Sequence, residues 1–220
     1  MKIKNIVFDL GGVIVDLDIA PALKTFARTG LMPANASLEQ ISKQGFPKDW
    51  PLSGLIHRMD CGELDTPTFF SILRQQCGTQ ASDEQLSEAF NSIIKMRKNR
   101  LEWLVKLREH YRLFLLSNVS DLHWKETCRQ AAEFGIPMEQ CFDRMFLSYR
   151  LRMTKPDPRI YELMIRETGI DPAETLYIDD LPDNIEAGRK AGLQGHKITS
   201  NALEADFPQT LNPKLIPEIL

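Results

Sequence analysis

The 220-residue sequence predicts an α/β protein in which a doubly wound parallel sheet carries an inserted helical unit. Short apolar runs that stop at polar clusters are typical of buried strands. Helical patterns separate these runs, which favours right-handed βαβ crossovers and a parallel sheet. One long stretch, residues 19–95, contains helical patterns and no convincing strand, and this indicates a separate insertion.

Five apolar runs are expected to form the strands of the sheet. They are residues 4–8, 113–116, 145–147, 176–178 and about 196–198. The first run stops at Asp9, the second at Ser117-Asn118 and the fourth at Asp179-Asp180. Ligand sites of parallel sheets lie at the carboxyl ends of the strands. We therefore expect these polar clusters to meet at one edge.

Helical patterns fill the gaps between the runs. Residues 101–110 carry apolar side chains at a spacing near 3.6. Further along, Asp157 can cap a helix that Gly169 closes. In the last helical pattern, Pro182 lies near the start and Gly192 lies just past the end.

The insertion is expected to be a helical cap. Its helical patterns cover residues 22–28, 55–59, 66–76 and 84–94. We therefore expect two domains, a catalytic core of residues 1–18 and 96–220 and a cap of residues 19–95.

Composition excludes several classes of protein. The chain has 27 basic and 30 acidic residues without a basic cluster, so a nucleic-acid footprint is not expected. No apolar run approaches the length of a membrane span, and the first residues turn acidic and glycine-rich too soon for a signal peptide. We expect a cytoplasmic monomer or small homo-oligomer that binds a small molecule. The four cysteines contain no CxxC pair and are expected to be reduced and mostly buried.

The strand-end clusters together supply the groups that phosphoryl transfer needs. Carboxylates as close as Asp9, Asp179 and Asp180 would repel one another unless a cation lies between them. An all-oxygen site suits Mg²⁺, which binds through carboxylates and substrate phosphate. Lys155 is a compact positive charge for a phosphoryl oxygen, and Ser117 can donate a hydrogen bond to another. A carboxylate in these surroundings can attack phosphorus and form an aspartyl-phosphate.

Each residue alone has a plainer interpretation. A strand-end aspartate such as Asp9 is most often a turn or cap residue, Lys155 alone is usually a solvated charge, and Asp179-Asp180 could simply begin a helix. The Gly-Gly pair at residues 11–12 lacks the third glycine and the helix of a dinucleotide fingerprint. The order and spacing of all the clusters favours the functional interpretation.

That order resembles the haloacid dehalogenase-like hydrolase superfamily. The segment FDLGGVIVD is similar to its first motif, LLSN to the second, the lysine of KPDPRIY to the third and YIDDLPDN to the fourth. The resemblance covers essentially the whole chain and is strongest to the branch of sugar-phosphate phosphatases that resemble α-D-glucose-1-phosphate phosphatase. It implies a Rossmann-like core with a helical cap, Mg²⁺ as cofactor and a small phosphorylated metabolite, such as a sugar phosphate, as substrate.

The resemblance also implies a role for each motif residue. Asp9 would be the nucleophile and a Mg²⁺ ligand, together with the backbone carbonyl of Gly11. Asp180 would be the main ligand from the fourth motif. Asp179 and Asn184 would support the metal site from its second shell.

The phosphoryl group would be bound by the second and third motifs. The resemblance implies that Ser117 and the Asn118 amide donate to it. Lys155 would pair with both Asp9 and the phosphate.

Gly11 departs from the pattern of most phosphatases in this superfamily, which carry an acid/base aspartate at that position. The branch named above tolerates glycine there, but losing a general acid/base costs roughly 10²- to 10⁴-fold in rate unless another group replaces it. A good leaving group, such as the anomeric oxygen of a sugar 1-phosphate, needs less help. Asp16 or Asp18 could substitute, although a surface position at the cap hinge is the plainer expectation.

Two other functions stay open. A haloacid dehalogenase uses an aspartate nucleophile without a metal, but that branch carries an aromatic residue where Gly11 stands. A catalytically silent phospho-ligand-binding or regulatory protein would be consistent with the missing proton donor. Evidence against a silent protein is that Asp9, Lys155 and Asp180 are all present and have no evident structural role.

The cap is expected to set the substrate, although surface charge is the plainer interpretation of any one candidate. The candidates are Lys43, Lys48, Trp50, His57 and Arg58 in the cap, with His123 and Lys125 after the second motif. Arg152 stands where relatives often have glycine.

Overall fold

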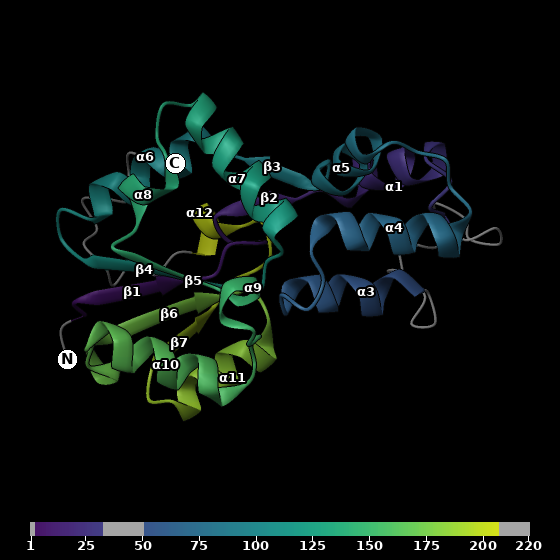
Figure 1. The fold of residues 1–220 in the computed structure, drawn as a ribbon. Coiled ribbons are helices and arrows are strands. Elements are labelled where there is room, and N and C mark those ends of the chain that lie inside the picture. The colour runs from purple at the N-terminus through teal and green to yellow at the C-terminus, as the bar shows by residue number, and fades with distance from the viewer. Residues whose placement is uncertain (1–2, 33–50, 207–220) are drawn as a thin grey trace.

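A computed structural model describes residues 3–32 and 51–206 of the chain. Its centre is a parallel sheet of five strands in the order β5-β4-β1-β6-β7 (Figure 1). The strands are β1 (Asn5–Phe8), β4 (Arg112–Ser117), β5 (Arg144–Leu147), β6 (Thr175–Asp179) and β7 (Gln194–Lys197). The chain moves outward from β1 first on one side and then on the other, so the predicted doubly wound class is confirmed.

The central strands are buried because helices cover both faces of the sheet. Phe8 of β1 lies opposite Leu115 of β4 and Ile178 of β6, and all three pack in one core cluster. The neighbouring Val7 points to the other face and packs with Tyr177. This alternation explains why the strands read as continuous apolar runs.

Helices from different parts of the chain supply the two covering layers. One face is covered by α6 (Lys98–Leu107), α7 (Asp121–Glu133) and α8 (Met138–Cys141), and the other by α10 (Pro158–Thr168) and α11 (Pro182–Lys190). The remaining short elements are α9 (Ser148–Leu151), η1 (Pro172–Glu174) and α12 (Leu203–Asp206). Asp157 caps α10 and Gly169 ends it in a left-handed conformation, as expected. By contrast, α6 begins and ends three residues earlier than expected.

The insertion forms a helical cap with its own core, beside the sheet domain (Figure 1). Its helices are α1 (Ile19–Arg28), α3 (Pro51–Asp60), α4 (Thr66–Cys77) and α5 (Asp83–Asn91). Phe26, Phe69 and Phe90 stack at its centre, with ring centroids about 5 Å apart. Leu122 of α7 joins this cluster from the core domain.

A two-stranded antiparallel ribbon connects the cap to the core. It pairs β2 (Val15–Leu17) with β3 (Ile94–Met96). The expectation of a helix through residue 94, and of no strand within residues 19–95, was therefore wrong, since α5 ends at Asn91 and β3 begins at Ile94. Three-residue strands carry too little periodicity to be recognised locally, and their pairing partners lie 77 to 81 positions away.

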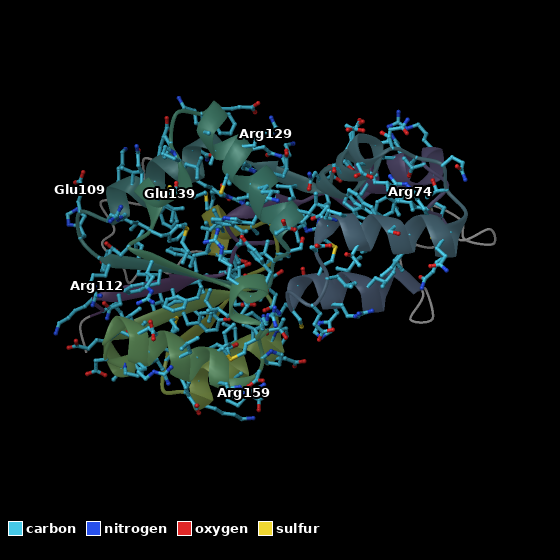
Figure 2. The ribbon with its side chains drawn as sticks, viewed as in Figure 1. Arg74, Glu109, Arg112, Arg129, Glu139 and Arg159 are labelled. Atoms are coloured by element: carbon cyan, nitrogen blue, oxygen red, sulfur yellow. The ribbon has the colours of Figure 1, made fainter. Side chains whose placement is uncertain are left out.

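Charged side chains surround the molecule. Figure 2 shows the labelled ones at its periphery, including Arg74 on the cap and Arg129 on α7. Arg129 forms ion pairs with Glu126 and Glu133 on the same helix. Over residues 3–32 and 51–206, no helix is both long and apolar enough to cross a membrane.

The four cysteines are free, as expected. Only Cys141 is buried, and the other three are partly exposed. The expectation of mostly buried thiols was therefore wrong.

Candidate active site

Three buried charges meet where β1 and β6 end side by side. The Lys155 ammonium lies 2.8 Å from Asp9 Oδ1 and 2.7 Å from Asp179 Oδ2. The Asp9 backbone amide donates to the Ile178 carbonyl, which fixes the residue to the edge of β6. This is the point where the strand order reverses, and such crevices are the usual ligand sites of doubly wound sheets.

The Asp9 carboxylate is held through one oxygen. Oδ1 accepts from both the Lys155 ammonium and the Leu10 amide, the latter at 2.7 Å. Burial raises the pKa of Asp9 to about 6; the Lys155 charge opposes this rise and the Asp179 charge adds to it. Burial acts to lower the pKa of Lys155, but the two carboxylates raise it above its ordinary value. The lysine is therefore a permanent cation.

The second motif positions the lysine. Asn118 follows β4, and its side chain accepts from the Lys155 amide at 2.8 Å and donates to the Lys155 carbonyl at 2.9 Å. Ser117 is the last residue of β4 and is buried at the same edge. The polar clusters expected at one sheet edge therefore meet there.

Asp179 has its acceptor capacity filled by protein groups. Besides Lys155, it accepts from the Tyr177 hydroxyl at 2.6 Å, the Leu181 amide at 2.8 Å and the Asn184 amide group at 3.1 Å. These contacts fix the orientation of the Asp179 carboxylate and leave its oxygens little capacity to bind a metal. Tyr177 was missed by the sequence analysis, because a tyrosine inside a buried strand looks like a core residue.

Asp180 differs from Asp179 in its hydrogen bonding. Its Oδ1 is buried and has no hydrogen-bond partner within the described ranges. Burial and the charge of Asp179 raise its pKa, while a hydrogen bond from Ser200 acts to lower it. One oxygen of Asp180 is therefore supported and the other is free.

The loop after β1 must come very close to Asp180. Gly12 has a φ of +74°, and a Cβ there would lie 2.5 Å from Asp180 Oδ2 and from Ser200 Oγ. Only glycine fits this position. Ser200, from the segment after β7, is the second residue that the sequence analysis missed, since nothing local marks it.

The carboxylate cluster fits a divalent cation. One carboxylate oxygen from each of Asp9, Asp179 and Asp180 lies within 4.8 Å of the other two. Asp180 has an oxygen left for an ion, whereas Asp179, whose oxygens are engaged, adds its negative charge. The donor set is all oxygen, which suits Mg²⁺. The unpartnered Asp180 Oδ1 is a buried acceptor that a cation would satisfy.

A family model of haloacid dehalogenase-like hydrolases matches residues 3–192, and these residues contain every motif of the site. The chain belongs to this family. The resemblance drawn from the four motifs is thereby confirmed.

Relatives of this haloacid dehalogenase-like hydrolase include phosphatases. The D-ribitol-5-phosphate phosphatase of Bacteroides thetaiotaomicron is 33% identical over 196 residues, covering 87% of this chain and 90% of the relative. A phosphatase of Mycobacterium tuberculosis is 25% identical, covering 94% of this chain and 92% of the relative.

Solved structures show the same architecture. A HAD family enzyme of Bacteroides thetaiotaomicron, in complex with magnesium and inorganic phosphate, superimposes with a TM-score of 0.80 at 30% identity, covering 96% of this chain and all of that one. The L-2-haloacid dehalogenase of Xanthobacter autotrophicus gives a TM-score of 0.58 at 18% identity over 97% of this chain and 88% of that one, and so shares the fold alone.

Neither candidate for the missing acid/base is free in this hydrolase. Asp16 is buried, with an ion pair to Arg97 and another, of 2.7 Å, to the fully buried Arg100. The expectation that Asp16 lies on the surface was therefore wrong. Asp18 is exposed and caps α1 by accepting from the Ala20 amide.

The candidates expected to face the substrate fall into two groups. Lys43, Lys48 and Trp50 lie outside the described residues. His57 and Arg58 are exposed on α3.

The side chains that follow the second motif are already engaged. The His123 ring lies 3.3 Å from the Phe90 carbonyl, and burial lowers the pKa of His123. Lys125 forms an ion pair with Asp121 at 2.7 Å. Arg152 has a left-handed φ of 54°, a conformation that glycine adopts without strain.

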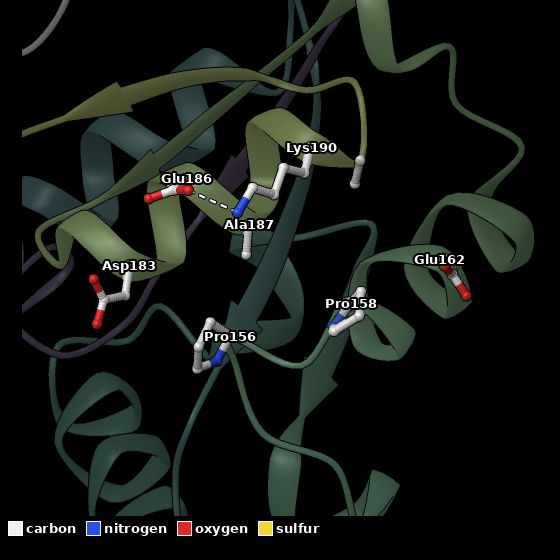
Figure 3. A pocket seen from close by; sticks show the side chains of 8 residues that line it. Pro156, Pro158, Glu162, Asp183, Glu186, Ala187 and Lys190 are labelled. Atoms are coloured by element: carbon white, nitrogen blue, oxygen red, sulfur yellow. Dashed lines mark ion pairs between the residues drawn. The ribbon is translucent and has the colours of Figure 1, made fainter.

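One cavity lies behind the site rather than in it. It occupies about 460 Å³ between α10 and α11 (Figure 3). Pro156 places it next to Lys155, but none of the residues predicted for catalysis, metal or phosphate lines it. We therefore do not assign it to the substrate.

Proposed function

We propose that this haloacid dehalogenase-like hydrolase is a Mg²⁺-dependent phosphatase that acts on a small phosphorylated metabolite, a sugar or polyol phosphate. The observation that carries the proposal is the cluster of Asp9, Asp179 and Asp180, in which the first two share the Lys155 ammonium and Asp180 has a free oxygen. The D-ribitol-5-phosphate phosphatase among its relatives supports a polyol phosphate as substrate. Residues 1–18 and 96–220 are proposed to form the catalytic core, and residues 19–95 are proposed to form the cap.

Asp9 is the proposed nucleophile. Its Oδ1 is held by Lys155 and the Leu10 amide, which turns Oδ2 toward the substrate. Oδ2 forms a bond to phosphorus as the ester P–O bond breaks, and the electron pair leaves on the alcohol oxygen. A water molecule then attacks the aspartyl-phosphate and releases inorganic phosphate, which restores Asp9.

The other motif residues hold charge while this happens. Asp9, Asp180 and the Gly11 carbonyl are the proposed Mg²⁺ ligands, and the bound ion neutralises charge on the phosphoryl oxygens. Asp179 and Asn184 keep Lys155 and the metal site in place.

The phosphoryl group has its own proposed contacts. The Ser117 hydroxyl and the Asn118 backbone amide donate to the phosphoryl oxygens that face β4, and the Lys155 ammonium binds another oxygen.

The leaving alcohol receives little help from the protein, because Gly11 carries no side chain and Asp16 is engaged in ion pairs. The proton that the leaving oxygen takes up is therefore supplied by water. A dehalogenase is disfavoured because three carboxylates that converge on one site suit a metal, which that chemistry does not use.

A phosphate-release screen tests the proposal. The panel contains D-ribitol 5-phosphate, α-D-glucose 1-phosphate and p-nitrophenyl phosphate, each with Mg²⁺ or EDTA. We expect turnover with Mg²⁺ and none with EDTA or in Asp9→Asn. Binding of these compounds without turnover would instead support a silent phospho-ligand-binding protein. Halide release from a 2-haloacid in EDTA would support a dehalogenase.

A further inference from the structure

The segment from the end of α3 to the start of α4, residues 60–66, contacts the core domain in two places. On one side, its backbone packs on the core, because a Cβ at Gly62 would collide with the Tyr149 carbonyl oxygen. The adjacent Cys61 thiol, whose pKa burial raises, lies beside the side chain of Thr154, the residue before Lys155. The segment therefore lies next to the loop that carries the lysine.

The same segment contacts the core a second time, at the start of α7. The Thr66 hydroxyl donates to Asp121 Oδ1 at 2.6 Å. Asp121 begins α7, directly after the loop that follows Ser117 and Asn118. Residues 60–66 therefore lie against both loops that are proposed to bind the phosphoryl group.

Asp60 stands at the start of this segment in an unfavourable environment. It is the last residue of α3, where the helix dipole disfavours an anion. Its carboxylate is only partly exposed, and no residue of the described ranges hydrogen-bonds or ion-pairs with it. Burial alone raises the pKa of Asp60 to about 7. A crowded and unpartnered carboxylate is destabilising, and such groups gather at functional sites.

We infer that Asp60 is a specificity-determining residue that accepts hydrogen bonds from hydroxyl groups on the unphosphorylated part of the substrate. This inference rests on the proposed phosphatase function. The phosphoryl group is bound in the core, so the hydroxyl-bearing end of a polyol or sugar phosphate extends toward the cap. Substrate hydroxyls then supply hydrogen-bond partners that the described residues do not give to Asp60.

Selectivity between two substrates tests the inference. One is D-ribitol 5-phosphate, or the polyol phosphate that the wild type prefers, and the other is p-nitrophenyl phosphate, whose leaving group has no hydroxyls. We expect Asp60→Leu to lower the ratio of their kcat/KM values by about 10- to 100-fold, as expected for a lost hydrogen bond to a charged group. Asp60→Asn keeps an acceptor and is expected to lower it less.

Glu63→Gln is the matched control. Glu63 is an exposed carboxylate in the same segment, and its removal is expected to leave the ratio unchanged. Thermal unfolding of each variant separates recognition from folding; if Asp60→Leu does not fold, Asp60→Asn decides, with a fall of at least about threefold expected. An unchanged ratio in a folded variant overturns the specificity role of Asp60 and leaves the phosphatase proposal standing. A wild type that hydrolyses neither substrate overturns the phosphatase proposal instead.

Discussion

Two buried carboxylates share a single ammonium in this site. Asp9 and Asp179 both lie within 2.8 Å of the Lys155 nitrogen, and all three side chains are almost fully buried. Lys155 therefore holds the site together in addition to its proposed contact with phosphate. Removal of the shared cation leaves two like charges facing each other without compensation.

Lys155→Met is expected to lower the free energy of unfolding by about 3–5 kcal/mol, because it leaves buried charges unpaired. It is also expected to abolish phosphatase activity. Urea denaturation measures the first effect, and Lys190→Met, at an exposed lysine on α11, is the control. A variant as stable as the wild type would contradict this account of the charges.

Ser200 supports one oxygen of Asp180 while the other stays free. Ser200→Ala is therefore expected to weaken Mg²⁺ binding by about tenfold, the lower end of the effect of losing such a supporting hydrogen bond. A titration of the thermal midpoint with Mg²⁺ measures this without reliance on turnover. Ser200→Thr keeps the hydroxyl and should bind Mg²⁺ nearly as well as the wild type, whereas identical titrations for all three proteins would remove Ser200 from the site.

The carboxyl of Asp60 makes stability depend on pH. Its pKa is raised in the folded state, so the folded protein binds the proton more tightly than the unfolded chain does. The wild type should therefore lose stability relative to Asp60→Asn as the pH rises from about 4 to about 7, with no further change above that. Thermal midpoints at pH 5 and pH 8 test this. The titration of the nearby His57, Cys61, Glu63 and Tyr149 contributes equally to both proteins, so it cancels in the difference between their midpoints. A pH-independent difference would contradict it.

At the scale of elements, the sequence predicted those helix boundaries that depend on neighbouring residues. Asp157 and Gly169 bound α10 because capping depends on neighbouring residues. The ribbon of β2 and β3 escaped prediction because its stability comes from a partner far along the chain. Asp16 was misplaced for the same reason, since its burial depends on Arg100 of α6.

The ribbon also bears on the missing acid/base. Leu17 of β2 is 37% exposed, and its Cδ1 would lie 3.3 Å from a Cβ at position 11. A flexible, partly exposed side chain can move aside, so Gly11→Asp should be accommodated. It is expected to raise turnover of alkyl phosphates by up to about 10²-fold, because their leaving oxygens need a proton.

Turnover of p-nitrophenyl phosphate should change little in Gly11→Asp, since its leaving group is a weak base. Gly11→Asn is the control for size without an acid. Equal effects of the two substitutions would show that the aspartate transfers no proton.

At the scale of the whole molecule, the order of the motifs was enough to predict the core of the site. Parallel strands bring their carboxyl ends to one edge, so Asp9, Ser117 and Asp180 were expected to meet there. The position of residues 60–66 was not predictable in this way, because they meet the core through contacts such as that between Thr66 and Asp121. Such contacts depend on how two domains pack, which no single segment encodes.

The buried Arg100 extends the functional unit beyond the motifs. It donates to the Val13 and Ile14 carbonyls beside the metal loop and pairs with Glu204 of α12 at 2.7 Å. The family match stops at residue 192, ahead of both Ser200 and Glu204. A protein trimmed to the matched segment would keep every motif residue, yet it would lose the bidentate Glu204 contact of the buried Arg100, leaving Asp16 to pair with it, and the Ser200 hydroxyl that supports Asp180. For engineering by truncation or by exchange of caps between relatives, the smallest workable core therefore reaches at least to residue 204.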